Sequence, residues 1–294
     1  MKPHECGAVV LVGGRGEFGQ FLQHEILLTL GVSSIMSIDR ETPRATYLSR
    51  LQQARHVVLA TPLAGYAERA CQLVHYCSDV KSPTTLWLIP SVQAEVWQEV
   101  SATLERVANP YLSAVFVHPM YGPNGFKAVE PEAWTFRNIL TATVEGAKHT
   151  LTEEVSQIAA VFYIKFNIPT VSFSPEEHDR LTAYSQGLSY CVARLMFEQP
   201  ELDALVRPQL SHLYHSFHAN QDLILDYLRI NAYMPQVVAA FTESWTKTRQ
   251  TSFADILEAF TQADTTLNHD ADSRIPTKWY VTLRRAAREI NLKV

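Results

Sequence analysis

Short apolar runs alternate with amphipathic segments through residues 1–165 of this 294-residue chain. Five runs have the length and β-branched content of buried strands: Ala8–Val12, Ser34–Ile38, Val57–Ala60, Thr84–Ile89 and Ala114–Val117. Apolar residues spaced by three and four predict helices between them: Phe18–Leu30, closed by Gly31, then Thr46–Ala54 and Ala64–Tyr76. This alternation indicates βαβ units, so an α/β fold with a parallel, doubly wound sheet is expected. Two more β-like runs, Asn138–Val144 and Val161–Phe166, are expected to extend the sheet.

The pattern changes near Pro175, and the rest of the chain is long amphipathic sequence. Ser174, followed by Pro175 and two glutamates, is typical of a helix N-cap with proline at the first helical position. Long helices are expected at Leu181–Phe197 and Leu223–Ala240, and breaks in the helical pattern are expected near several prolines, Pro235 among them. We therefore predict two domains, residues 1–172 for the sheet and residues 173–294 for an all-helical half.

Composition narrows the possible functions. Lysine and arginine total 25 against 30 for aspartate and glutamate, and no basic run occurs, which argues against sequence-independent binding of nucleic acid. No stretch reaches about eighteen apolar residues, so no membrane span is expected. Four scattered cysteines without a CxxC pair, and no recognisable signal peptide, favour a cytoplasmic protein with reduced thiols and no metal site.

A glycine-rich loop follows the first predicted strand. Gly14-Arg15-Gly16-Glu17-Phe18-Gly19 fits the pattern G-x-G-x-x-G, with a buried strand directly before it and an amphipathic helix directly after it. In that context Gly14 allows the tight turn, Gly16 lets backbone N–H groups approach a pyrophosphate, and Gly19 lets the helix pack on the strand. The phosphates would then lie at the positive end of the helix. The loop therefore predicts a Rossmann-type dinucleotide site.

The end of the second predicted strand bears on the choice between NAD and NADP. Asp39 stands twenty residues after Gly19, and a carboxylate there accepts hydrogen bonds from ribose hydroxyls and repels a 2′-phosphate. NAD is therefore the expected cofactor, while the adjacent Arg40 keeps NADP open because an arginine can contact that phosphate. The expected cofactor-binding residues are Gly14, Arg15, Gly16, Phe18, Gly19, Asp39, Arg40, Thr61 and Pro62.

Later segments of the chain resemble one enzyme family. The string from Phe116 to Pro123, FVHPMYGP, resembles the HPMFGP signature of prephenate dehydrogenases. Glu177-His178-Asp179 resembles the opening of that family's second domain, and Ser91-Val92 resembles the start of its Ser-Val-Lys motif. The order and spacing of these segments also match. The resemblance covers most of the chain, and the family includes arogenate and 4-amino-4-deoxyprephenate dehydrogenases.

The resemblance implies an NAD-dependent oxidative decarboxylation of a cyclohexadienyl acid. Hydride leaves the ring carbon that bears the 4-hydroxyl, the ring carboxylate leaves as carbon dioxide, and the ring becomes aromatic, so prephenate gives 4-hydroxyphenylpyruvate. His118 matches the family's catalytic histidine, and Ser91 matches its serine. These residue types suit the chemistry, because an imidazole with a near-neutral pKa can accept the hydroxyl hydrogen while a serine orients the same group.

Three more residues are expected near the substrate. His178 and Gln186 are eight residues apart and share nearly one face of the predicted helix, which in the family faces the active site across the domain cleft. A capping role in the first helical turn is the alternative for His178. Tyr121 is expected to line the pocket, with a packing role as the alternative.

Two departures from the family pattern remove positive charge. The family's Ser-Val-Lys reads Ser91-Val92-Gln93 here, and the region expected to hold its carboxylate-binding arginine, His212–Asn220, contains no arginine. Arg207 and Arg229 flank that region. Because burying an unpaired carboxylate is costly, either another cation binds prephenate or the substrate differs. The alternative substrate is 4-amino-4-deoxyprephenate, which would give 4-aminophenylpyruvate.

Other classes of protein stay open. The 3-hydroxyacid and 6-phosphogluconate dehydrogenases also join a Rossmann half to a helical half, but they lack the HPM(Y/F)GP string. A regulator that binds NAD without turnover is a further alternative, against which the presence of both Ser91 and His118 argues. The apolar helical half, which in the family interlocks two subunits, predicts a homodimer.

Overall fold

The computed structural model describes residues 7–119, 137–142, 173–191 and 221–248. The chain divides into two compact units, Met1–Met234 and Pro235–Val294. The run Val161–Phe166 lies outside the described residues, and the domain boundary expected at residue 172 lies at their edge. None of the described helices is both long and apolar enough to cross a membrane.

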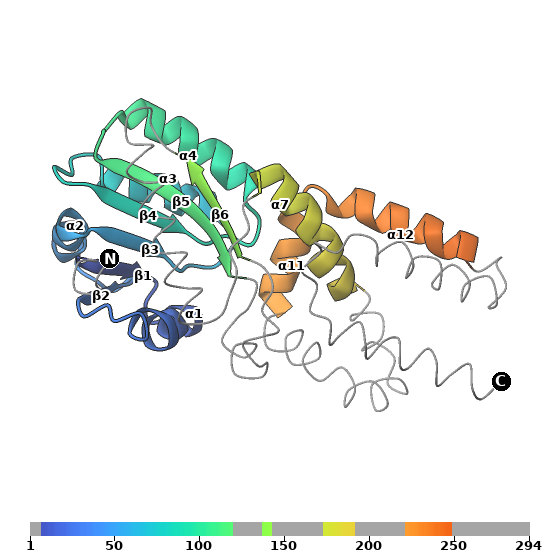
Figure 1. Cartoon of the computed structure of the whole chain (residues 1–294), viewed down its shortest axis with the longest axis horizontal. Helices are drawn as coiled ribbons and strands as arrows, with labels where there is room; N and C mark the ends of the chain where they lie inside the picture. Colours follow the sequence, from blue (N-terminus) through green and yellow to red (C-terminus); the bar gives the residue numbers. More distant parts are fainter. Residues whose placement is uncertain (1–6, 120–136, 143–172, 192–220, 249–294) are drawn as a thin grey trace, which may run out of the picture. The chain divides into compact units, whose positions relative to one another are not determined.

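Six strands form one sheet in the order β2-β1-β3-β4-β5-β6 (Figure 1). The first five run parallel, as the alternating pattern predicts, and each overlaps its predicted run. Their bounds are β1 Val9–Val12, β2 Ile35–Ile38, β3 His56–Leu59, β4 Thr84–Leu88 and β5 Leu112–Pro119. β6, Arg137–Ala142, extends the sheet as expected but pairs antiparallel with β5, so the sheet is mixed rather than wholly parallel.

The antiparallel pairing changes the place of His118. β5 continues through Pro119 because its last residues pair with β6, His118 opposite Asn138 and Pro119 opposite Arg137. The sequence predicts this strand to end at Val117 with His118 just beyond it, and that prediction is wrong. His118 therefore stands on a hydrogen-bonded strand, which holds its backbone in place more firmly than a loop would.

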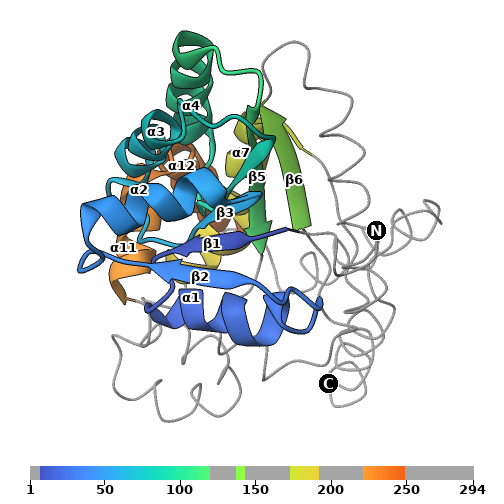
Figure 2. The same ribbon diagram turned by 90° about the vertical axis from the view of Figure 1, so that its left-hand side faces the viewer.

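Helices cover both faces of the sheet (Figure 2). On one face lie α2 Arg44–Gln53, α3 Tyr66–Tyr76 and α4 Ala94–Val107; on the other lie α1 Glu17–Phe21 and its π-helical continuation η2 Leu22–Leu27. Alternate residues of β1 show the division, because Val10 and Val12 join the larger core cluster while Leu11 packs with α1 and η2. Gly31 has a φ of +81°, the left-handed conformation expected of a glycine that follows a helix.

Helices α7, Pro175–Thr182, and α11, Gln221–Ile230, belong to the same compact unit as the sheet. Ser174 caps α7 as predicted, because its Oγ accepts the Glu177 N–H at 3.1 Å. α7 continues as the π-helical segment η4, Ala183–Gly187.

The segment expected as one helix at Leu223–Ala240 is divided just before Pro235, near which the sequence also predicts a break. α11 ends at Ile230, and α12 runs over Met234–Thr248. Asn231 lies at the break, where its Oδ1 accepts the Tyr233 N–H at 3.0 Å. Asparagine side chains offer the backbone such bonds in competition with the helical ladder, which explains the interruption.

Candidate active site

The order of the strands reverses beside β1, because β2 lies on one side of it and β3 on the other. Open α/β sheets bind ligands outside the carboxyl ends of the strands at such a switch point. The glycine loop follows β1 and the turn Thr61-Pro62 follows β3, so the structure brings these two predicted segments to one place. Backbone bonds fix both exits, from Gly13 N–H to Ile38 O and from Ala60 N–H to Val12 O, each at 2.8 Å.

Three glycines of the loop are required by the fold itself. Gly13 has a φ of +82°, and a Cβ there would lie 2.4 Å from Ala60 O, so Gly13, which the motif does not include, is the left-handed residue of the turn. Gly14 lies against β2, where a Cβ would come within 2.5 Å of Ser37 Oγ. A Cβ on Gly19 would lie 2.2 Å from Gly13 O, which is the close packing of helix on strand that the sequence predicts.

Gly16 is glycine for a different reason. It is exposed, and the nearest described atom to a Cβ there would be Gly13 O at 3.4 Å, an ordinary contact. Gly16 is also the N-cap of α1, and the Gln20 N–H donates to its carbonyl at 2.9 Å. The N–H groups of residues 17–19 therefore precede the first helical bond. A glycine that the fold does not require, next to such N–H groups, fits a phosphate held by the backbone.

Asp39 borders this loop from the end of β2. Its side chain is 14% exposed, its Oδ1 is 3.4 Å from the Arg15 backbone nitrogen, and its Oδ2 is 3.8 Å from Arg15 Nε. Arg15 also reaches Glu41, with Nη1 3.2 Å from Oε2. The predicted ribose-binding carboxylate thus lies beside the glycine loop, and the cation next to it is Arg15, while Arg40 is exposed.

The turn after β3 forms the other side of the switch point, and α3 holds it. Arg69 Nε donates to Thr61 Oγ1 at 3.1 Å, and Arg69 Nη2 donates to the carbonyls of Pro62 and Ala64. The buried Tyr66 hydroxyl donates to Leu59 O and accepts the Ile89 N–H, both at 2.8 Å, so it joins the ends of β3 and β4. Neither side chain could be selected from the sequence, because these bonds depend on the packing of α3.

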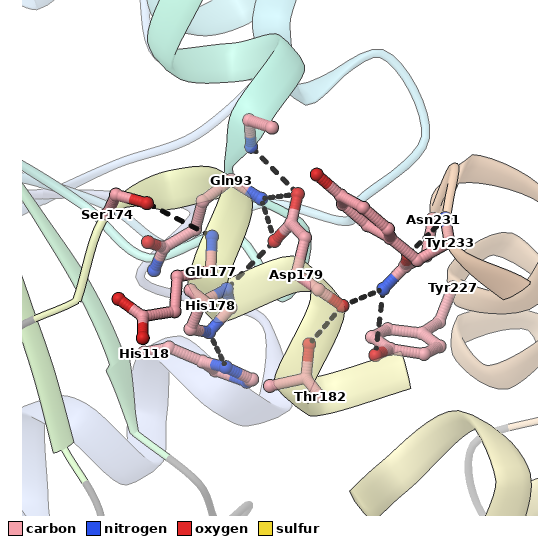
Figure 3. A network of polar contacts seen from close by, with 11 residues as sticks. Gln93, His118, Ser174, Glu177, His178, Asp179, Thr182, Tyr227, Asn231 and Tyr233 are labelled. Atoms are coloured by element: carbon pink, nitrogen blue, oxygen red, sulfur yellow. Dashed lines mark hydrogen bonds and ion pairs between the residues drawn. The ribbon is translucent and has the colours of Figure 1, made fainter. Parts of the chain in front are cut away.

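A second group of polar side chains lies at the carboxyl end of β5 (Figure 3). His118 Nδ1 is 2.8 Å from His178 Nε2, and His178 Nδ1 is 2.8 Å from Asp179 Oδ1. All three side chains are buried. The structure thus brings together two predicted residues 60 positions apart, and both ring nitrogens of His178 are engaged there.

Asp179, which sequence reasoning did not select, is held at the start of α4. The Gln93 N–H lies 2.8 and 3.0 Å from the two carboxylate oxygens, and the Ala94 N–H donates to Oδ2 at 2.8 Å. Gln93 is the N-cap of α4 without a side-chain cap of its own, so Asp179 caps this helix from α7. A carboxylate is favourable there because of the helix dipole. Its adjacency to His178 is the signal that points to it.

Burial controls the protonation of His118. It lowers the pKa of this imidazole well below its ordinary value of 6.5, and the neighbouring His178 adds to the lowering. Desolvation acts in this direction because it disfavours the charged form. His118 is therefore neutral at pH 7 and able to act as a base.

The other predicted site residues are less fully placed. Ser91 is half-buried after β4, whose residue Leu88 pairs with Phe116 of β5, so Ser91 and His118 stand at the same edge of neighbouring strands. Gln186 is half-buried in η4, and Arg229 is exposed on α11. Outside the described residues lie Tyr121, Arg207 and His212–Asn220.

The side chain of Gln93, which stands where the family motif has lysine, is fully buried. Neither its Nε2 nor its Oε1 has a hydrogen-bond partner among the described residues. Buried side-chain amides are normally hydrogen-bonded. The side chain of Gln93 is therefore an exception, whereas the backbone N–H of the same residue is bound by Asp179.

No protein-family model and no curated protein matches this chain. Similar solved structures include prephenate dehydrogenase from Aquifex aeolicus, at 15% identity and a TM-score of 0.56 over 92% of this chain and 100% of that one. Its complex with hydroxyphenyl propionate and NAD+ matches with a TM-score of 0.57 at 15% identity, over 89% and 98%. Synechocystis arogenate dehydrogenase matches with a TM-score of 0.56 at 14% identity, over 91% and 100%. The chain therefore shares the Rossmann-type α/β fold of prephenate and arogenate dehydrogenases.

Proposed function

We propose that this chain is an NAD-dependent dehydrogenase that oxidatively decarboxylates a prephenate-type cyclohexadienyl acid to an aromatic 2-oxo acid, with prephenate as the leading substrate. The observation that carries the proposal is the chain of contacts from His118 through His178 to Asp179 at the carboxyl end of β5. It supplies a buried, neutral imidazole at the sheet edge that also holds the glycine loop. The fold of a prephenate dehydrogenase solved with NAD+ and hydroxyphenyl propionate supports the same assignment.

The residues at the switch point fit a dinucleotide. Gly16 leaves room at the start of α1, where backbone N–H groups can hold a pyrophosphate. Asp39 can accept hydrogen bonds from the ribose hydroxyls, and its charge disfavours a 2′-phosphate, which favours NAD over NADP. When bound, the nicotinamide would supply the hydride acceptor.

His118 then has a defined task in the reaction. As hydride leaves the ring carbon and the carboxylate departs, positive charge develops at the ring hydroxyl. A neutral imidazole that accepts the hydroxyl hydrogen stabilises this charge. Ser91, at the end of the neighbouring strand, would orient the same hydroxyl. The lowered pKa of His118 keeps the imidazole available for this role at pH 7.

A second substrate follows from the loss of positive charge at Gln93. Its neutral, buried amide stands where the family motif has lysine, and a changed substrate would account for this change. We therefore propose 4-amino-4-deoxyprephenate, with an amine in place of the ring hydroxyl, as the alternative.

Turnover of three acids tests the proposal. Prephenate, arogenate and 4-amino-4-deoxyprephenate are each incubated with the full-length chain and NAD or NADP, and reduced cofactor, carbon dioxide and aromatic product are measured. One of the acids is expected to yield reduced cofactor, carbon dioxide and aromatic product in equal amounts, with NAD preferred over NADP. Reduction of neither cofactor on any acid would refute the dehydrogenase, and NAD binding without turnover would favour the regulator.

We also propose that the chain forms a homodimer through its helical half. Leu181, Tyr184 and Leu223 are large apolar side chains left exposed on α7, η4 and α11, and such surfaces often mark interfaces. Size-exclusion chromatography with light scattering tests this, and a monomer at micromolar concentration would refute it.

A further inference from the structure

We propose that Asp179 is a positioning residue that fixes the tautomer of His118 through His178. The inference deepens the proposed function and takes its catalytic meaning from it. Its structural content rests on three contacts that involve neither substrate nor cofactor: from Asp179 to the start of α4, from Asp179 to His178, and from His178 to His118.

The first step concerns the state of Asp179. The N–H groups of Gln93 and Ala94 can only donate, and they lie 2.8 to 3.0 Å from the two carboxylate oxygens. Both oxygens must therefore accept, which an ionised carboxylate does. Its place at the first turn of the 14-residue helix α4 stabilises that negative charge.

The second step follows the hydrogens along the chain of contacts. Because Asp179 Oδ1 accepts, the hydrogen between it and His178 belongs to His178 Nδ1. In its neutral form His178 has one N–H, so its Nε2 is then an acceptor and the hydrogen toward it belongs to His118 Nδ1. His118 Nε2 therefore carries a lone pair. The tautomers are assigned from this network of donors and acceptors.

The third step connects the tautomer to the reaction. The opposite tautomer of His118 would place an N–H on Nε2, which could not accept the hydrogen of the substrate hydroxyl. Asp179 is well fixed for this role, because its backbone carbonyl also accepts Asn231 Nδ2 at 2.9 Å, from the end of α11. Groups behind a functional imidazole commonly set its tautomer in this way.

Nuclear magnetic resonance of the full-length chain tests the tautomers directly. Long-range proton–nitrogen correlation distinguishes a protonated from an unprotonated ring nitrogen, and the variants His118→Asn and His178→Leu assign the signals. At neutral pH both His118 and His178 are expected to carry hydrogen on Nδ1 and a lone pair on Nε2. A His118 protonated on Nε2 would overturn the proposal.

Kinetics of variants test whether Asp179 acts through His178. Asp179→Asn removes the charge, and its neutral amide cannot accept all the bonds that the carboxylate accepts. Asp179→Asn and His178→Leu are each expected to lower kcat by about 10- to 10³-fold with the KM for NAD unchanged. The double variant is expected to be no slower than the slower single variant, because the two residues act as one unit. Ser174→Ala is the control, since it removes the cap of α7 without touching these contacts, and it should keep kcat.

Two kinetic results would also overturn the proposal: a folded Asp179→Asn variant with kcat within about twofold of the unmodified chain, or fully additive losses in the double variant. If Asp179→Asn fails to fold for want of the α4 cap, His178→Leu, which leaves that cap in place, and the tautomer spectrum still decide. If the tautomers are as expected but no cyclohexadienyl acid is oxidised, the proposed function fails while the tautomer control stands.

Discussion

The glycine loop and the His118 cluster lie at the carboxyl edge of one sheet but are built differently. The loop is one short stretch, Gly13–Gly19, and its features are backbone conformation, room for a ligand and N–H groups at the start of a helix. The cluster joins side chains of β5 and α7 to the backbone of α4, across 60 and 86 positions of the sequence. A backbone site can thus be recognised from a short motif, while a side-chain site depends on how distant elements pack.

Because the two regions are built differently, we expect that a substitution can impair the function of one and leave the other unchanged. The largest expected effect is that of His118→Asn on kcat. The substitution removes the base but leaves the glycine loop intact, so kcat should fall by about 10²- to 10⁴-fold while the dissociation constant for NAD stays unchanged. Steady-state kinetics and a fluorescence titration with NAD measure the two quantities.

His75→Asn is the matched control for that variant, because it makes the same exchange at an exposed position of α3. It should leave both kcat and the affinity for NAD unchanged. Unchanged turnover in His118→Asn would reject the role of His118, and a parallel loss of NAD affinity would show that the two regions are coupled.

Within the loop, two glycine substitutions separate folding from binding. In Gly19→Ala the new Cβ would lie 2.2 Å from Gly13 O and 2.7 Å from Gly14 Cα, so the backbone must shift, at a cost of about 1–3 kcal/mol or more in the free energy of unfolding. Gly16→Ala meets only an ordinary contact, so the stability of the free protein should stay unchanged. Its affinity for NAD should fall by about tenfold or more, or roughly 1.4 kcal/mol.

Chemical denaturation with and without NAD distinguishes these two variants. A Gly16→Ala variant that NAD stabilises as much as it does the unmodified chain would contradict the phosphate-binding role of that glycine. A Gly19→Ala variant of full stability would show that the loop can relax around the added atom.

Local features of this fold could be predicted from sequence, because their causes are local. The first five strands follow from short β-branched runs, the turn at Gly31 from the need for a positive φ, and the start of α7 from Ser174. The extension of β5 through His118 could not be predicted, since it depends on pairing with β6. A break near Pro235 is expected from sequence, but its exact place at Asn231 could not be predicted, because the Asn231 side chain bonds there to Tyr233 and Asp179.

The candidate site divides in the same way. The glycine motif located the loop and Asp39, but it does not include the left-handed Gly13, whose need to be glycine depends on the approach of Ala60 from β3. The resemblance located His118 and His178. It did not select Asp179, whose capping of α4 becomes visible only when α7 is packed against that helix.

Tyr66 joins the ends of β3 and β4, which lie between the two regions in the sheet, and Tyr66→Phe should weaken this junction. The substitution leaves the Leu59 carbonyl and the Ile89 N–H without their partner in a buried place, at a cost of about 1–3 kcal/mol in the free energy of unfolding. Tyr76→Phe, on the exposed face of the same helix, should change it little. Denaturant titration of both variants measures their free energies of unfolding. Equal values for Tyr66→Phe and Tyr76→Phe would show that water replaces the lost Tyr66 hydroxyl.

The smallest effect is expected from Gln93→Met, which tests whether the side chain of residue 93 belongs to the functional His118 cluster. Asp179 binds the backbone N–H of residue 93, which methionine keeps, so kcat should not change. Because the buried amide has no partner among the described residues, its loss should leave stability unchanged or raise it by about 1 kcal/mol in denaturant titration. A loss of stability would instead place a partner for the amide elsewhere in the chain. A fall in kcat/KM at unchanged stability would show that the amide contacts the substrate. The His118 cluster would then extend to the first turn of α4.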